Sequence, residues 1–343
     1  MKKECILYRP IKGDLVQCTA CNHYCLIKNS ETGKCGVRQN IDGKLYLLVH
    51  SQAVAINIDP IEKKPLFHFY PGSKVFSFGT FGCNLFCKFC QNWDISQTRF
   101  SNTPDIENKG EYLPPEDIIN YCKEHNINTI AYTYNEPTIF FEYAYDTMVL
   151  ARKNNIKNVF VSNGFQSKEF WEKASDLIDA INIDLKGFSE NFYKDICGAR
   201  LKPILDNIEF IAKHTNIWLE ITTLIIHGEN DKDEDLLEIA NFIKNISLDI
   251  PWHISAFYPS YKMLDTPPTS FEVLKKAYEI GKKVGLKYIY TGNIGDSGTE
   301  STYCPKCNEL LIKRSGHIGQ NIEIYWKKPG ICHKCSEKIP GVW

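Results

Sequence analysis

The sequence predicts an α/β protein organised around a partial (βα)6 barrel. From Lys74 onward, short runs rich in β-branched and aromatic residues alternate with segments whose apolar residues recur at helical spacing, which is typical of βαβ units in a parallel sheet. Polar residues directly follow five of these runs. Segments of different composition, each with at least four cysteines, flank this central part on both sides.

The individual elements follow from these patterns. Strands are expected at residues 74–80, 128–135, 157–163, 180–186, 216–226 and 251–259, with a candidate seventh at 287–293. Helical periodicity between them is clear at residues 115–126, 140–154, 233–245 and 270–285. We therefore expect a cysteine-rich N-terminal extension (1–73), the barrel (74–297) and a separate C-terminal domain (298–343).

Composition excludes several functional classes. The 343 residues carry 40 Lys and Arg against 41 Asp and Glu, so no long-range field attracts the chain to nucleic acid or to an anionic membrane. No run approaches roughly 18 apolar residues and no secretory signal is visible, so we expect a cytoplasmic protein without a membrane anchor. In that reducing compartment, metal binding explains the 14 cysteines better than disulfides do.

The polar residues at the strand ends predict a shared pocket. The carboxyl ends of parallel strands meet at one side of a barrel, where ligands bind. A single Asn or Asp after a strand more often caps the next helix, but five polar strand ends favour a common site. These residues are Asn135 and Glu136, Ser162 and Asn163, Asp184 and Lys186, Thr222 and Thr223, and Asn293.

Three cysteines on one loop predict an iron–sulfur cluster. Cys83, Cys87 and Cys90 follow the first strand of the barrel within eight positions. A structural zinc ion normally takes four protein ligands, whereas three thiolates on a four-iron cluster leave one iron open for another ligand. Two alternatives stay open: a redox-active trio, or a zinc site completed by a distant histidine such as His68.

This loop resembles that of the radical S-adenosylmethionine (SAM) superfamily, in which a CxxxCxxC loop follows the first strand of a partial barrel. Phe89 occupies the aromatic position before the last cysteine. The resemblance implies that a 4Fe–4S cluster on Cys83, Cys87 and Cys90 receives an electron from a donor such as flavodoxin or ferredoxin. It further implies that SAM binds the open iron and is cleaved to methionine and a 5′-deoxyadenosyl radical, while the protein orients and shields the cofactor.

The same resemblance assigns cofactor-binding roles to residues at the strand ends. YTYNEP (132–137) stands where the family has Gly-Gly-Glu, so Glu136 is expected to hold the amino group of SAM, with Tyr134 and Asn135 in place of the glycines. VSNG (161–164) and DLKG (184–187) resemble motifs of the glycyl-radical activating enzymes. They assign cofactor contacts to Ser162, Asn163, Asp184 and Lys186.

Three of the residues near these motifs carry alternatives. Asp184 and Lys186 lie two positions apart on one side of a strand and could form a simple ion pair. His253 and Tyr258 are expected to reach toward cofactor or substrate, but a buried, hydrogen-bonded imidazole explains His253 equally well.

The C-terminal domain reads as a zinc ribbon. CPKC and CHKC supply Cys304, Cys307, Cys332 and Cys335, and the residues between them contain two apolar runs, 309–315 and 321–326, that predict a hairpin. Two CxxC knuckles joined by a hairpin form a zinc-ribbon-like domain with one structural zinc ion. An auxiliary iron–sulfur cluster at these cysteines is the alternative.

The N-terminal extension contains a further set of four cysteines. CTACNHYC and the following GKCGVR supply Cys18, Cys21, Cys25 and Cys35, whose spacing allows one metal site. Zinc and a second iron–sulfur cluster both remain open. Cys5, Cys122 and Cys197 are interpreted as ordinary small apolar residues, Cys122 within a helix.

Together, these motifs resemble the radical SAM enzyme of the AmmeMemoRadiSam system over nearly the whole chain. That family is related to pyruvate formate-lyase activating enzyme, and the resemblance implies AMMECR-type and Memo-type partner proteins. The expected activity is hydrogen abstraction from an unidentified substrate, with a protein among the candidates. The alternatives are activation of a glycyl-radical enzyme and, in another class, a zinc-dependent scaffold or nucleic-acid-binding module.

Overall fold

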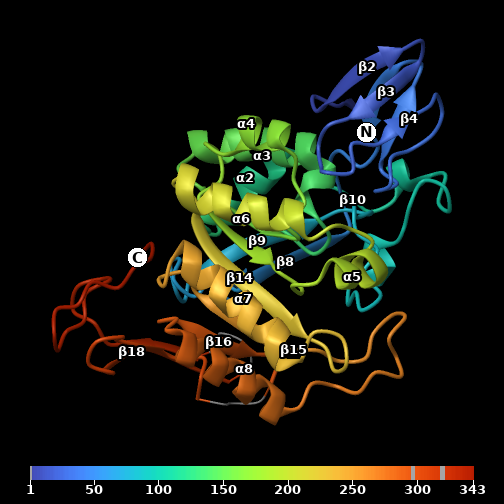
Figure 1. Ribbon diagram of the computed structural model, residues 1–343. Coiled ribbons are helices and arrows are strands. Elements are labelled where there is room, and N and C mark those ends of the chain that lie inside the picture. The colour runs from blue at the N-terminus through green and yellow to red at the C-terminus, as the bar shows by residue number, and fades with distance from the viewer. Residues whose placement is uncertain (1, 295–297, 317–320) are drawn as a thin grey trace.

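The computed structural model describes residues 2–294, 298–316 and 321–343 (Figure 1). Its centre is an eight-stranded sheet in the order β16-β15-β14-β13-β12-β11-β9-β8. The strands from β9 to β16 run parallel in chain order, and β8 pairs antiparallel with β9 at one edge. Each new parallel strand therefore joins beside the preceding one, and among the described strands the sheet stays open between β8 and β16.

The central strands lie at the predicted positions, but each is shorter than its predicted range. Their bounds are β8 (Ala55–Pro60), β9 (Lys74–Gly79), β11 (Thr129–Tyr132), β12 (Lys157–Ser162), β13 (Ala180–Asp184), β14 (Trp218–Ile225), β15 (Trp252–Ala256) and β16 (Ile289–Gly292). The α/β partial barrel predicted from the sequence is confirmed, and the candidate seventh parallel strand is real, since β16 pairs with β15. β8 comes from the predicted N-terminal extension, so part of that segment contributes to the sheet.

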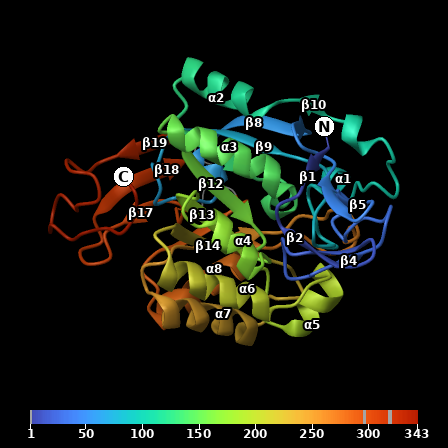
Figure 2. The ribbon, with the colours of Figure 1, turned by 90° about the horizontal axis from the view of Figure 1, so that it is seen from above.

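Helices cover the outside of the sheet (Figures 1 and 2). The longer ones are α2 (Pro115–Glu124), α3 (Phe141–Lys153), α4 (Lys168–Ala174), α6 (Lys202–His214), α7 (Asp233–Ile246) and α8 (Phe271–Val284). The sequence ranges predicted α2, α3, α7 and α8 and omitted α4 and α6. Shorter turns are η1 (Ile61–Lys63), α1 (Trp93–Ser96), η2 (Ile106–Asn108), η3 (Pro137–Phe140), α5 (Glu190–Phe192) and a π-helical turn, η4 (Tyr193–Cys197).

The N-terminal part consists of small antiparallel sheets. The first contains β1 (Lys3–Glu4), β6 (Lys44–Leu47) and β5 (Arg38–Ile41). The second contains β2 (Tyr8–Lys12), β3 (Leu15–Cys18) and β4 (Leu26–Ile27). A third sheet pairs β7 (Gln52–Ala53) with β10 (Glu111–Tyr112). This part and the C-terminal strands lie on opposite sides of the barrel in both views (Figures 1 and 2).

The C-terminal part contains β17 (Thr302–Tyr303), β18 (Leu310–Ser315) and β19 (Asn321–Ile324). β18 and β19 form the predicted hairpin, and β17 adds a third strand. The guanidinium of Arg314 donates to the Phe67 carbonyl (2.7 Å) and lies over the Phe67 ring. Phe67 in turn donates its backbone N–H to Glu220 near the start of β14, so Phe67 connects the C-terminal part to the amino-terminal end of this strand.

No helix in the described part of the chain combines the length and apolar character needed to cross a bilayer.

Candidate active site

The loop after β9 is held against three other segments. The backbone N–H of Phe86 donates to the Cys197 carbonyl (2.8 Å), and Lys88 accepts from the N–H of Lys262 (2.9 Å). On the third side, Gly82 has a φ of +86°, and a Cβ there would lie 2.6 Å from the Cys35 carbonyl oxygen. Only glycine fits this close approach, so the loop has one packed position beside the N-terminal part.

Cys83, Cys87 and Cys90 on this loop line one cavity of about 440 Å³ at the carboxyl ends of the strands. Burial raises the pKa of the Cys83 and Cys90 thiols. Contact with the Cys197 side chain, followed by burial, raises the pKa of Cys87. The sulfurs therefore favour the neutral thiol until a metal cation stabilises the thiolate, which suits a cluster site of three ligands.

The alternative in which His68 completes a zinc site is wrong for this geometry. The Nδ1 of His68 lies 2.7 Å from the Pro340 carbonyl oxygen, and its Nε2 lies 2.6 Å from the Tyr290 hydroxyl. Both ring nitrogens therefore have partners near the C-terminal part, and His68 does not line the cavity of the three cysteines.

Cys197, interpreted from the sequence as a small apolar residue, lies beside the catalytic loop, the segment after β9 that carries Cys83, Cys87 and Cys90. It is fully buried at the end of the π-helical turn η4, and its side chain contacts Cys87. Cys197 does not line the cavity, so the side of the trio that faces the cavity remains accessible. A contact between positions 110 residues apart leaves no signal in local spacing.

Glu136 has a different position from the one that the resemblance implies. Its side chain is fully buried and does not line the cavity. The carboxylate accepts hydrogen bonds from Thr138 (N 3.1 Å, Oγ1 2.6 Å), from the Asn163 N–H (2.8 Å) and from Ser162 Oγ (3.0 and 3.1 Å). Glu136 thus joins the end of β11 to the end of β12, and both of its oxygens already have donors.

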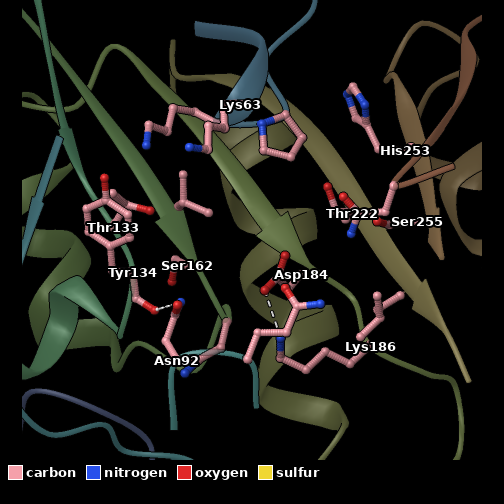
Figure 3. Close-up of a pocket in the computed structure, with 18 of the residues that line it drawn as sticks. Lys63, Asn92, Thr133, Tyr134, Ser162, Asp184, Lys186, Thr222, His253 and Ser255 are labelled. Carbon is pink, nitrogen blue, oxygen red and sulfur yellow. Dashed lines mark hydrogen bonds and ion pairs between the residues drawn. The ribbon is translucent and has the colours of Figure 1, made fainter. Parts of the chain in front are cut away.

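Asn135 and Tyr134 replace the two glycines of the related motif. The Nδ2 of Asn135 donates to the Gly82 carbonyl (2.8 Å) and to Thr80 Oγ1 (3.2 Å), which fixes the start of the catalytic loop. Tyr134 has a φ of +73°, a left-handed conformation that costs a non-glycine residue about 1–3 kcal/mol. Its carbonyl accepts from Asn92 (2.7 Å; Figure 3). Its hydroxyl donates to Asp59 (3.0 Å), so neighbouring contacts stabilise this conformation.

Ser162 and Asn163 line the cavity at the end of β12. The Nδ2 of Asn163 donates to Asn84 Oδ1 (2.8 Å), and its Oδ1 accepts from the Phe165 N–H (3.1 Å). Asn84 directly follows the first cysteine of the trio, so the amide of Asn163 connects β12 to the catalytic loop. Sequence spacing could not identify Asn84, because it stands inside the cysteine motif as an ordinary intervening residue.

Asp184 and Lys186 form an ion pair of 2.7 Å and both line the cavity (Figure 3). Burial lowers the pKa of Lys186, but the charge of Asp184 and then that of Cys87 outweigh this effect and raise its pKa above the ordinary value. Lys186 Nζ also lies 5.7 Å from the centre of the Phe89 ring. Asp184 and Lys186 therefore form an ion pair and also line the cavity. The ammonium group of Lys186 stays charged and faces the three cysteines.

Thr222, beside Asp184 on the neighbouring strand, adds an unpaired polar atom to this wall. Thr222 lines the cavity, and its buried Oγ1 has no hydrogen-bond partner among the residues that the structure describes. A buried hydroxyl without a partner is unfavourable, so this atom is available to a bound ligand.

His253 lies near the start of β15, at the opposite end of the cavity from Lys186 (Figure 3). Its Nε2 is 2.6 Å from Glu220 Oε2, and its ring meets Phe67 edge to face. His253 is therefore the buried, hydrogen-bonded imidazole considered as an alternative. Tyr258 is exposed, and its hydroxyl donates to the Asn293 carbonyl (2.9 Å).

The four C-terminal cysteines form a compact set. Their sulfur atoms lie within 4.8 Å of one another, with 3.5 Å between Cys304 and Cys335 and 3.7 Å between Cys307 and Cys332. Four thiolates about 2.3 Å from one ion stand about 3.8 Å apart at tetrahedral geometry. The set can therefore hold a single metal ion without rearrangement.

The four N-terminal cysteines surround a second, small cavity beside the catalytic loop. Its walls also include Arg38, Asn84 and His23. The structure thus brings together all four residues predicted there: Cys18, Cys21, Cys25 and Cys35.

An open parallel barrel, with three cysteines on the loop after its first parallel strand and a cavity at the strand ends, defines a radical SAM enzyme. The Radical SAM superfamily model matches residues 78–243, so this part of the chain is a radical SAM domain. The scaffold or nucleic-acid-binding module considered from the sequence is accordingly not retained.

Among particular relatives, Uncharacterized protein MJ0808 of Methanocaldococcus jannaschii is 41% identical over 98% of both chains. The 4-hydroxyphenylacetate decarboxylase activating enzyme of Clostridioides difficile is 24% identical over 49% of this chain and 55% of its own. Putative glycyl-radical enzyme activating enzyme MJ1632 of Methanocaldococcus jannaschii is 28% identical over 61% of this chain and 76% of its own, so the chain is homologous to glycyl-radical activating enzymes. A radical SAM methyltransferase from Sphaerobacter thermophilus has the same fold, with a TM-score of 0.51 at 13% identity and 71% coverage of each chain.

Proposed function

We propose that the chain cleaves SAM reductively and that the resulting 5′-deoxyadenosyl radical abstracts hydrogen from a substrate, as the radical enzyme of the AmmeMemoRadiSam type. The observation that carries this proposal is the set of three cysteines, two buried and one half-buried, that line one cavity at the strand ends. A 4Fe–4S cluster on Cys83, Cys87 and Cys90 would supply the electron and an open iron for the amino acid part of SAM.

The residues around the trio would bind and orient SAM. Lys186 presents a cation that suits the carboxylate of SAM, and Asp184 presents an anion that suits its ammonium group. The amide of Asn163 and the unpaired hydroxyl of Thr222 supply polar contacts on the same walls. Glu136 would position Ser162 and Asn163 by joining the ends of β11 and β12, without touching the cofactor itself.

A protein is the substrate class that we favour, with AMMECR-type and Memo-type proteins as partners. The support is the whole-chain resemblance of the motifs to the AmmeMemoRadiSam enzymes and the homology to activating enzymes, one of which is named for 4-hydroxyphenylacetate decarboxylase. Activation of a glycyl-radical enzyme is the second candidate, favoured by the same homology.

Isotope transfer tests this proposal. Reconstituted protein, SAM and dithionite are incubated without oxygen with a deuterated AMMECR-type, Memo-type or glycyl-radical enzyme, and the mass of 5′-deoxyadenosine is measured. We expect 5′-deoxyadenosine to form and to gain deuterium with an AMMECR-type or Memo-type protein. Transfer from the glycyl-radical enzyme alone favours the second candidate, and no 5′-deoxyadenosine from cluster-loaded protein contradicts both.

For the C-terminal set, zinc is the metal that we infer. The tetrahedral spacing of Cys304, Cys307, Cys332 and Cys335 and their separation from the catalytic cavity suit a structural ion. Anaerobically purified protein is expected to contain zinc that survives loss of the catalytic cluster.

A further inference from the structure

Arg99 contacts the catalytic loop without lining the cavity. Its Nη1 donates to the Cys83 carbonyl (3.1 Å) and to the Lys34 carbonyl, and its Nη2 donates to Gln97 Oε1 (3.1 Å). The guanidinium carbon also lies 4.3 Å from the centre of the Phe86 ring, which belongs to the same loop as Cys83. A cation is therefore held against the catalytic loop on the side away from the cavity.

The backbone around Arg99 is fixed as well. The N–H of Arg99 donates to Asn102 Oδ1 (2.9 Å), and the N–H of Phe100 donates to the Gly36 carbonyl (2.8 Å). Gly36 has a φ of +77°, and a Cβ there would lie 2.4 Å from the Cβ of Arg99, so only glycine permits this approach. The fold thus determines where the guanidinium lies before any cofactor binds.

No carboxylate in the described part of the chain pairs with Arg99. Its acceptors are two backbone carbonyls and one side-chain amide, all of them neutral. The buried Arg38, by contrast, donates from both Nη atoms to Glu142 (2.8 Å each). A half-buried cation without an anionic partner is unfavourable, so the position of Arg99 favours an anion that the protein acquires later.

The three catalytic cysteines would provide this anion when they hold a cluster. Burial lowers the pKa of Arg99, whereas the charges of Cys35 and Cys83 act in the opposite direction, so both sulfurs lie within electrostatic range of the guanidinium. Metal-bound thiols are deprotonated, and a 4Fe–4S cluster on three thiolates carries a net negative charge. Partial burial limits the screening of this attraction by water and salt.

We propose that Arg99 is a positioning residue whose permanent positive charge raises the reduction potential of the cluster at Cys83, Cys87 and Cys90. In the step concerned, a donor of the flavodoxin or ferredoxin class loses one electron and the cluster gains it, and no bond forms or breaks. The reduced cluster carries one more negative charge, so the cation stabilises it more than the oxidised cluster. This inference rests on the proposed function, which places the cluster on these cysteines.

A redox titration of cluster-loaded protein without oxygen tests the proposal, with electron paramagnetic resonance of the signal that changes when SAM is added. R99Q removes the charge and should shift the reduction equilibrium of this cluster about tenfold toward the oxidised form, or about 59 mV to more negative potential. R99K keeps the charge and loses the planar fork of donors. Its equilibrium should stay within about twofold of wild type, or about 18 mV.

A purely structural role predicts a different pattern, because both variants lose the hydrogen bonds that join Arg99 to the carbonyls of Lys34 and Cys83. A shift in R99K as large as that in R99Q would overturn the proposal, as would an unchanged potential in R99Q. If R99Q does not fold, R99K still decides, since a tenfold shift in this charge-retaining variant overturns the proposal.

R9Q is the matched control. Arg9 is exposed and also donates to a neutral amide, that of Gln17 (2.8 Å), so R9Q makes the same change in net charge away from the catalytic loop. Its potential should stay within about 18 mV of wild type. Wild-type protein that loads no SAM-sensitive cluster would overturn both the proposed function and this inference. A SAM-sensitive cluster whose potential is the same in wild type and R99Q would overturn this inference alone.

Discussion

The cysteines of the catalytic loop and those of the C-terminal ribbon differ in the chain segments that fix their positions. Cys304, Cys307, Cys332 and Cys335 already stand at tetrahedral spacing on short turns around a hairpin. The three catalytic cysteines depend on other elements for their position: Gly82 against Cys35, Phe86 on the π-helical turn, and Asn135 across from β11.

This difference separates a structural site from a reactive one. The ribbon offers four thiols from its own chain segment, so a metal ion held there would be enclosed and would replace the hydrophobic core that a small domain lacks. The catalytic trio offers three thiols and faces a cavity of about 440 Å³ with Asp184, Lys186 and Thr222 on its walls. An incomplete ligand set is useful only where a rigid scaffold keeps the remaining position open to a substrate.

Removing the catalytic trio should have the largest effect on activity. We expect C83A/C87A/C90A to reduce formation of 5′-deoxyadenosine at least about 1,000-fold, equivalent to roughly 4 kcal/mol, because no other cysteine in the described part of the chain lines the cavity. Chromatographic assay of 5′-deoxyadenosine with dithionite and SAM measures this loss. C122A is the control, since Cys122 is fully buried in α2 away from the site. Cleavage retained by the triple variant would contradict the assignment of the trio.

Removing ribbon cysteines should affect stability and spare chemistry. C304S/C307S is expected to lose the zinc ion and, with it, metal-binding energy of the order of 10 kcal/mol that folds the ribbon. Amide hydrogen exchange should then rise throughout β17 to β19, while 5′-deoxyadenosine formation stays within about threefold of wild type, a shift under roughly 1 kcal/mol. A loss of cleavage as severe as that of the trio variant would show that the ribbon metal participates in catalysis.

The sequence predicted the barrel because its signals are local. Alternating strand and helix patterns fixed the parallel strands, and the C-terminal CxxC pairs predicted the hairpin that β18 and β19 form. The edge strand β8 was missed, because AINIDP (55–60) precedes the first repeat and pairs antiparallel. The predicted strand at 128–135 was too long, because the backbone turns away after β11 at residues 133–135, where Tyr134 has a positive φ.

The sequence predicted the site less completely than the fold, because contacts between residues far apart in the chain determine the geometry of the site. The spacing of Cys83, Cys87 and Cys90 predicts a cluster loop, and the polar strand ends predict a pocket, which the structure shows beside these three cysteines. Motif matching could not tell that Glu136 points into a buried hydrogen-bond network, or that His253 pairs with Glu220. The contact of Cys197 with Cys87 depends on how η4 packs, which no local pattern encodes.

A substitution of Glu136 distinguishes a positioning role from a cofactor contact. E136Q places an amide where both oxygens now accept from Thr138, Ser162 and Asn163, so at least one donor loses its acceptor. We expect the free energy of unfolding to fall by about 2 kcal/mol, measured by denaturant titration, with the Kd for SAM changed less than threefold. E172Q on the exposed face of α4 is the control. A tenfold weaker Kd without a loss of stability would instead favour direct cofactor binding.

The smallest effect is expected at Lys186, where the ion pair and the cofactor contact overlap. K186Q removes the cation that faces the trio but keeps a polar side chain beside Asp184. SAM binding to cluster-loaded protein should weaken about tenfold, or about 1.4 kcal/mol, in equilibrium titration, because the SAM carboxylate loses its charged partner. K194Q, an exposed change on η4, should bind normally. If K186Q lowers stability and leaves the Kd unchanged, Lys186 serves only Asp184, and the open side of the trio must recognise SAM through other groups.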